Sequence, residues 1–246
     1  MPCMAGPSLW GGKRAMKRSE VNQIMREADA FMRRHGFALP PFAHWSPDEF
    51  RERAGPRITK ARLGWDITDY GEDRFAEMGL FLFTLRNGSL ADLRAGGGMC
   101  YAEKLLISRR DQLSPMHRHV VKAEDIINRG GGTLVIEPYM SAPDGSVDRS
   151  AVIEVPCDGV LRRLAPGDKL QLAPGESVTL MPGVWHAFWG EGDDVLIGEV
   201  STVNDDLTDN VFEQPIGRFA AIEEDETPLH WLVSDYGTWG NGGTTR

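Results

Sequence analysis

Between about residues 65 and 200, short runs of β-branched and aromatic residues alternate with tight-turn signals, which restricts the fold strongly. The apolar runs cover residues 80–85, 104–108, 133–137, 151–155, 169–172, 177–180 and 195–200. Asn87-Gly88 follows the first run, and Pro-Gly turns separate several later ones. Strands at this near-regular spacing, with no helical periodicity between them, predict an antiparallel sandwich or barrel.

The N-terminal part has a different pattern. Across residues 19–35, apolar side chains recur at three- and four-residue spacing, which predicts an amphipathic helix. Ser19 is the expected N-cap of this helix, and Gly36 suits the left-handed position after its end. A second short helix is expected after Ser46, because Glu49 completes a capping box with it. These helices are expected to pack outside the barrel.

The chain of 246 residues is long enough for one large β-barrel domain. We expect a single domain over residues 19–235, with its helical part at 19–60. Residues 1–18 and 236–246 are expected to be flexible. The acidic run at 223–226 is expected to be a solvated loop.

Composition argues against several classes of partner. The formal net charge is −9, from 36 acidic and 27 basic side chains, which disfavours a broad nucleic-acid surface. No apolar run approaches the roughly 20 residues that a transmembrane helix needs, and no export signal is visible. Cys3, Cys100 and Cys157 fit neither a disulfide framework nor a CxxC knuckle, so reduced thiols and a cytoplasmic location are expected.

One group of residues indicates metal binding. His117 and His119 stand two apart, and on a strand that spacing sends both imidazoles to the same face, here the barrel interior. Glu124 follows five residues later, and His186 comes after a Pro-Gly turn far along the chain. Three neutral imidazoles and one carboxylate form a mixed nitrogen and oxygen set suited to one divalent manganese, iron, cobalt, nickel or zinc ion.

These residues resemble the two sequence motifs of the cupin superfamily. The first motif appears as H-x-H, four residues, Glu124 and then glycines 130–132. Elements of the second motif are Gly175, Pro182, Gly183 and His186. The chain departs from the pattern at Asp111, where the first motif has glycine, and at Gly190, where the second usually has asparagine. The resemblance implies a mainly β, cupin-type antiparallel β-barrel (jelly-roll).

The surrounding sequence resembles one family more closely. Residues 103–109, 115–119, 122–132 and 199–206 are similar to segments of the D-lyxose isomerase family, and the resemblance runs from about 45 to 219. It implies a manganese-dependent aldose–ketose isomerase that interconverts D-lyxose with D-xylulose, and often D-mannose with D-fructose. It also implies a homodimer.

The isomerisation chemistry suggests roles for particular residues. Four protein ligands leave two positions on an octahedral ion, which suits two adjacent sugar oxygens and the charge of an enediolate. A carboxylate must carry the proton between C1 and C2 of a cis-enediol. Glu199 is the candidate, because a lone acid in the apolar strand 195–200 is otherwise costly. This hypothesis favours proton transfer over a hydride shift.

The remaining site candidates are polar or aromatic residues near these motifs. Lys122 and Lys104 are expected to donate hydrogen bonds to the reacting sugar oxygens. Asp206 and Arg218 lie in polar loops suited to binding sugar hydroxyls, and Trp45 is a candidate for stacking on a sugar face.

Three questions stay open from the sequence. A cupin dioxygenase and a non-catalytic, metal-dependent sugar-binding cupin are alternative functions for the same ligand set. The sequence does not rank D-lyxose against D-mannose. Ligand types do not choose between Mn²⁺ and the alternatives Co²⁺ or Zn²⁺.

Overall fold

The computed structural model describes residues 15–205 and 208–239. Strands account for 42% of the chain and helices for 19%, which confirms the expected mainly β class. The strands are β1 (Met16–Lys17), β2 (Gly64–Thr68), β3 (Leu80–Asn87), β4 (Tyr101–Ser108), β5 (Ser114–His119), β6 (Glu124–Ser141), β7 (Val147–Asp148), β8 (Ile153–Cys157), β9 (Val160–Leu164), β10 (Leu170–Leu172), β11 (Ser177–Leu180), β12 (Trp185–Thr202), β13 (Asn210–Phe212) and β14 (Ile222–Glu223). The helices are α1 (Arg18–Arg34), the 3₁₀ helix η1 (Pro41–His44), α2 (Pro47–Arg53), α3 (Pro56–Ala61), α4 (Leu90–Ala95) and α5 (Tyr236–Trp239).

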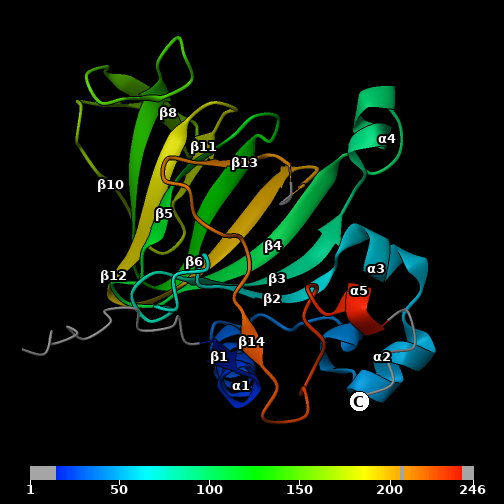
Figure 1. The fold of residues 1–246 in the computed structure, drawn as a ribbon. Coiled ribbons are helices and arrows are strands. Elements are labelled where there is room, and N and C mark those ends of the chain that lie inside the picture. The colour runs from blue at the N-terminus through cyan, green and yellow to red at the C-terminus, as the bar shows by residue number, and fades with distance from the viewer. Residues whose placement is uncertain (1–14, 206–207, 240–246) are drawn as a thin grey trace, which may run out of the picture.

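The main sheet is a curled antiparallel half-barrel (Figure 1). Its central path runs β10-β6-β12-β4-β3-β2. Off this path, β7 and β11 pair with β6, and β5 pairs with β12 and with β13. The two longest strands, β6 and β12, pair with each other along most of their length. The expected runs 133–137 and 195–200 are therefore pieces of longer strands. A long strand that curls can contribute to both ends of the half-barrel.

The bend in this central pair lies at a glycine run. Gly130 and Gly131 adopt φ of +151° and +95°, and the pairing register with β12 shifts here. A Cβ on Gly131 would lie 2.0 Å from the carbonyl oxygen of Asp194, and one on Gly130 would lie 2.3 Å from Nδ1 of His35. Only glycine permits both the backbone conformation and these close approaches.

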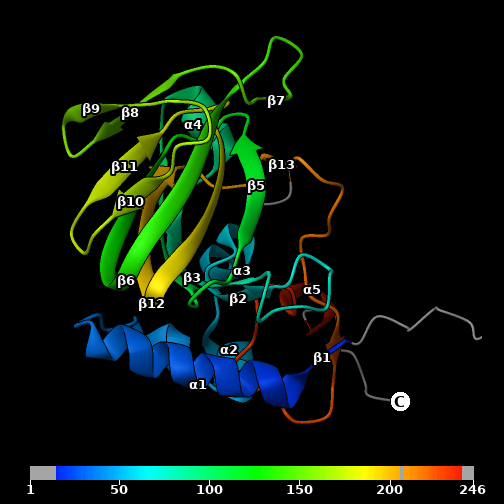
Figure 2. The ribbon, with the colours of Figure 1, turned by 90° about the vertical axis from the view of Figure 1, so that its left-hand side faces the viewer.

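The two faces of the sheet belong to different cores. Side chains alternate along each strand, so Leu106 and Ile197 pack inside the half-barrel, whereas Ile107 and Leu196 pack outside it. The outer core is covered by α1, which lies across the base of the sheet in Figure 2. The expected placement of the N-terminal helices outside the barrel is thus confirmed.

The start of α1 differs from the sequence expectation. Lys17 is the N-cap and its amide donates to Oε2 of Glu20 at 2.9 Å, so the assignment of Ser19 as the N-cap was wrong. Ser19 instead donates its hydroxyl to Asp225 at 2.8 Å. Arg18, which was grouped with the flexible start, is only 1% exposed and forms ion pairs with Glu224 and Asp235.

The acidic run and the C-terminal segment therefore hold α1 in place. Glu224, Asp225 and Glu226 are exposed but bind Arg18, Ser19 and Asn22 respectively. Residues 236–239, expected to be part of a flexible tail, form α5, and the Tyr236 hydroxyl donates to the Leu63 carbonyl at 2.6 Å. Residues 1–14 and 240–246 lie outside the described residues. Within the described ranges, every helix is too short or too polar to span a membrane.

Candidate metal centre and active-site cavity

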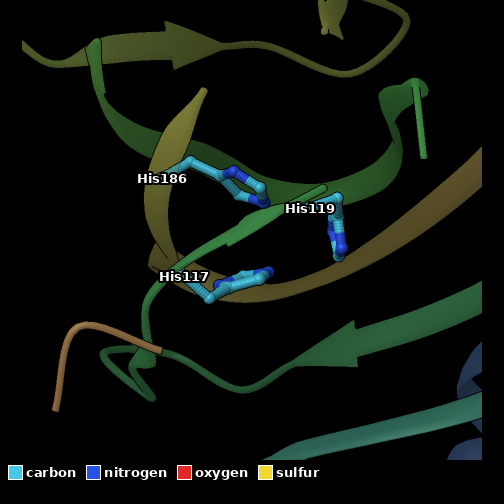
Figure 3. Close-up of side chains that lie close together, drawn as sticks. All are labelled: His117, His119 and His186. Carbon is cyan, nitrogen blue, oxygen red and sulfur yellow. The ribbon is translucent and has the colours of Figure 1, made fainter. Parts of the chain in front are cut away.

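Three imidazoles meet inside the half-barrel. His117 and His119 lie on β5, and His186 lies near the start of β12, directly opposite His117 in the strand register. Figure 3 shows the three side chains directed toward one another from these strands. One ring nitrogen from each falls within 4.8 Å of the others, which is close enough to hold one metal ion. The predicted convergence of these three residues is observed.

Hydrogen bonds fix the orientation of two of these rings. Nδ1 of His117 lies 2.8 Å from the Pro115 carbonyl oxygen, and Nδ1 of His186 lies 3.1 Å from that of Val184. A carbonyl only accepts, so each Nδ1 carries the hydrogen and each Nε2 presents a lone pair. This backbone support is the usual arrangement behind a metal-binding histidine.

Burial favours the neutral form of His117 and His119. Loss of solvation, followed by the neighbouring His186 and His119, holds the pKa of His117 well below its usual value. Loss of solvation and then the Lys122 ammonium lower the pKa of His119. Neutral imidazoles are the form that binds metal ions, so no proton has to leave either ring at neutral pH.

Glu124 joins the histidines as the first residue of β6. Its Oε1 lies 3.3 Å from Nε2 of His119 and 3.2 Å from Nε2 of His186, and this buried oxygen has no hydrogen-bond partner among the described residues. Burial raises the pKa of Glu124, but the charge of the Lys122 ammonium outweighs burial and leaves this pKa well below its usual value. A carboxylate oxygen and imidazole nitrogens that converge without a donor between them fit a divalent cation.

A buried network of charges lies beside this group. Nζ of Lys122 is 2.5 Å from Oε2 of Glu124 and 3.0 Å from Oε1 of Glu199. Nζ of Lys104 is 3.5 Å from the same oxygen of Glu199 and donates to Oδ1 of Asn204 at 2.7 Å. The side chains of both lysines and both glutamates are at most 5% exposed. Removing a charged side chain from water costs free energy, so buried charges are found where they are paired or have a function.

The other predicted site residues fare differently. The three histidines, Glu124 and Glu199 line one cavity inside the half-barrel, and Arg218 lines it too. The Arg218 guanidinium donates to buried Asp66 at 2.9 Å. Trp45 lies in the helical layer, where it packs against Phe42 and Phe50, and it is absent from the described cavity lining. Its assignment as a stacking residue in this cavity does not match that position. Asp206 lies outside the described residues.

Several lining residues were not predicted from the sequence. The Tyr70 hydroxyl and the Ser114 Oγ lie 2.7 Å apart in the cavity wall, and Asn210 and Phe212 contribute from β13. Tyr70 adopts a left-handed φ of +57°, which is uncommon for a bulky residue. Ser114 stands three residues before the His-x-His pair, but nothing in the sequence links Tyr70 to that pair.

A curled antiparallel sheet with three convergent histidines inside it defines a cupin-type barrel with a candidate metal centre. A sequence profile of the D-lyxose isomerase family matches residues 16–236. A D-lyxose/D-mannose isomerase of Serratia proteamaculans is 47% identical over 90% of this chain and 98% of its own length. The enzyme of that name from Escherichia coli O157:H7 is 44% identical over the same shares. The chain belongs to the D-lyxose isomerase family and is a sugar isomerase.

Solved structures with the same fold include two L-ribose isomerases. The Geodermatophilus obscurus protein superposes with a TM-score of 0.59 at 18% identity, and the Cellulomonas parahominis protein, solved with L-ribose, with 0.57 at 17%. Each match covers 86% of this chain and 100% of the other. At such low identity, the likeness supports the fold alone.

Proposed function

We propose that the protein is a metal-dependent aldose–ketose isomerase that interconverts D-lyxose with D-xylulose, and D-mannose with D-fructose. The observation that supports this most directly is the buried group of His117, His119, Glu124 and His186 beside two lysines and Glu199. The relatives named D-lyxose/D-mannose isomerase suggest the sugars.

His117, His119, His186 and Glu124 would hold one divalent ion, for which we propose Mn²⁺, with Co²⁺ or Zn²⁺ as alternatives. When bound, the ion would supply charge stabilisation for negative charge that develops on O1 and O2 of the sugar. The hydrogen-bonded Nδ1 atoms fix the imidazoles, so that little rearrangement is needed for binding. Replacing Glu124 by Gln should lower the bound-metal content, measured by elemental analysis; unchanged content would remove it from the ligand set.

Glu199 is the proposed proton carrier between C1 and C2. It is 4% exposed, lines the cavity and faces both lysine ammonium groups, so a carboxylate stands where the proton would be carried. Lys122 and Lys104 are proposed to donate hydrogen bonds to the reacting sugar oxygens. Because these side chains are already buried and oriented, their charges act without a large solvent rearrangement.

Arg218 is proposed to bind hydroxyls of the sugar away from the reacting carbons. Its backbone carbonyl accepts from the Thr68 hydroxyl at 2.6 Å, and its guanidinium is held by Asp66. Two attachments to β2 thus orient one side chain toward the cavity. Asp206 stays a predicted partner in this binding, outside the described residues.

The decisive experiment adds each divalent metal separately to the metal-free protein and follows D-lyxose, D-mannose and a panel of other aldoses by proton NMR. We expect ketose formation that depends on metal and proceeds without oxygen. Turnover that requires oxygen would indicate a dioxygenase, and sugar binding without turnover under every metal would indicate a binding protein. Either result would overturn the proposal.

Two further predictions concern the oligomeric state of the protein and its location in the cell. A homodimer is proposed from the family resemblance, and light scattering of the purified protein measures it directly. A cytoplasmic location stays a prediction from the sequence.

A further inference from the structure

Three successive backbone amides converge on one buried carboxylate beside the site. Oδ1 of Asp209 accepts from the amides of Val120 and Val121 at 2.9 and 2.7 Å, and its Oδ2 accepts from the amide of Lys122 at 2.9 Å. Asp209 is 6% exposed. Hydrogen bonds to an ionised acceptor are stronger than those between neutral groups, so this contact holds the backbone firmly.

The segment that these bonds hold carries the site. Residues 120–123 connect His119, the last residue of β5, with Glu124, the first residue of β6, and they include Lys122. The side chains do little to anchor the first half of the connection, since Val120 and Val121 are 53% and 41% exposed. The Asp209 carboxylate is therefore a main attachment of this part of the backbone to the rest of the molecule.

Asp209 also connects this segment to β13, the strand paired with β5. It directly precedes β13, in which Asn210 pairs with His119 and Phe212 pairs with His117. Asn210 and Phe212 line the cavity. One short stretch of chain therefore shapes the sugar-binding wall and fixes the backbone from which the Lys122 side chain extends.

We propose that Asp209 is a positioning residue that sets the Lys122 ammonium between Glu124 and Glu199. The inference rests on the proposed function, in which Lys122 contacts the reacting sugar oxygens. The Lys122 Nζ lies 2.5 Å from one carboxylate and 3.0 Å from the other, so a small displacement of its backbone changes both contacts. Asp209 acts through Lys122 and has no contact of its own with the sugar.

The first test is Asp209→Asn. This change replaces one carboxylate oxygen with an NH₂ group, which faces an amide donor and cannot accept from it. We expect kcat to fall about 10–100-fold with little change in KM. A fall of this size is typical when a residue that orients a site residue by hydrogen bonds is replaced. Amide exchange at residues 120–122 should accelerate.

Asp148→Asn is the matched control. Oδ1 of Asp148 accepts from the amides of Ser150 and Ala151 in a surface turn, so this carboxylate has similar bonds, and Asp148 is not among the described lining residues. The control should leave kcat unchanged. An Asp209→Asn variant with normal kcat per folded, metal-loaded molecule would overturn the proposal.

A double-mutant cycle separates positioning from general stability. If Asp209 acts through Lys122, then Asp209→Asn should lower kcat little further in a Lys122→Met background, whereas independent effects would multiply. Full multiplication would contradict the proposal. If Lys122→Met itself leaves activity intact, the proposed role of Lys122 fails; if only Asp209→Asn is silent, this inference alone fails.

Amide exchange in the wild type tests the contact even if Asp209→Asn does not fold. The amides of residues 120–122 should exchange slowly although the neighbouring valine side chains are exposed. Exchange as fast as in an open loop would overturn the proposal without reference to any activity.

Discussion

The inner and outer faces of strands β4 and β12 bury different kinds of side chain. On β4, Leu105 and Ile107 point outward into an apolar core under α1, whereas Lys104 points inward to Glu199 on β12. The outer face consists of hydrocarbon packing, which stabilises the fold roughly in proportion to buried area. The inner face near the histidines buries charges at a cost in stability. Near the histidines, the charged site residues and the outer packing residues therefore lie on opposite faces of the same strands, and mutations at these two groups should affect different measurements.

The largest effect is expected at the centre of the inner face. His186→Gln removes one of three convergent imidazoles, so we expect loss of bound metal. We also expect kcat/KM to fall about 1000-fold or more, because a bound metal stabilises the transition state by several kcal/mol and each 1.4 kcal/mol corresponds to a factor of ten in rate. Elemental analysis and NMR turnover measure the two quantities. His44→Gln, at an exposed position in η1, is the control. Normal turnover by the metal-free His186→Gln protein would refute a metal role.

Glu199→Gln should slow proton transfer. We expect kcat of the folded protein to fall about 10²–10⁴-fold, the usual contribution of a general acid–base group. Wild-type turnover in deuterated water should place deuterium at C1 or C2 of the product. Product without any label would instead favour a hydride shift, in which hydrogen stays on the sugar.

Leu196→Ala should do the opposite. Leu196 is 1% exposed in the outer core, so its truncation should lower the free energy of unfolding by about 2–5 kcal/mol, while kcat of the folded protein stays near the wild-type value. Urea denaturation measures the loss. Val200→Ala is the matched control, because Val200 lies on the same strand but is 42% exposed, and its change should stay within about 0.5 kcal/mol. A large loss of kcat in Leu196→Ala would show that the two faces are coupled.

The sequence revealed the two faces to different extents. Short apolar runs separated by turn signals were enough to predict a mainly β fold, and the His-x-His spacing on a strand was enough to bring His117 and His119 together. Trp45 was misplaced because an aromatic residue before a helix carries no sign of which face of the sheet it will cover. Tyr70 and Asp209 were missed because their contacts join segments at least 44 residues apart, which no local pattern encodes.

The pH dependence of stability should reflect histidines on both faces. Burial lowers the pKa of His117 and His119 on the inner face, and of His230 in the outer layer. Below the unfolded pKa of about 6.5, the unfolded chain binds protons that the folded chain does not, so stability should fall as the pH drops from 7 toward 5. Each fully buried imidazole contributes a slope of at most about 1.4 kcal/mol per pH unit.

Urea denaturation of the metal-free protein at several pH values measures this slope. His230→Gln should remove a smaller part of it, because His230 is partly exposed and water screens its charge. A stability that rises on acidification over this range would contradict the assignment of neutral imidazoles in the folded protein.

The smallest effect concerns the helical layer outside the sheet. The Ser46 hydroxyl accepts from the amide of Glu49 at 3.3 Å, and the Glu49 carboxylate accepts from the amide of Ser46 at 3.0 Å. Ser46→Ala should therefore lower stability by about 1 kcal/mol, or about 2–4 °C in Tm, without changing kcat. Ser19→Ala should cost less, because the Ser19 hydroxyl binds exposed Asp225 and caps no helix amide. A larger loss from Ser19→Ala would mean that the attachment of α1 to the acidic run matters more to the outer layer than the capping of its helices.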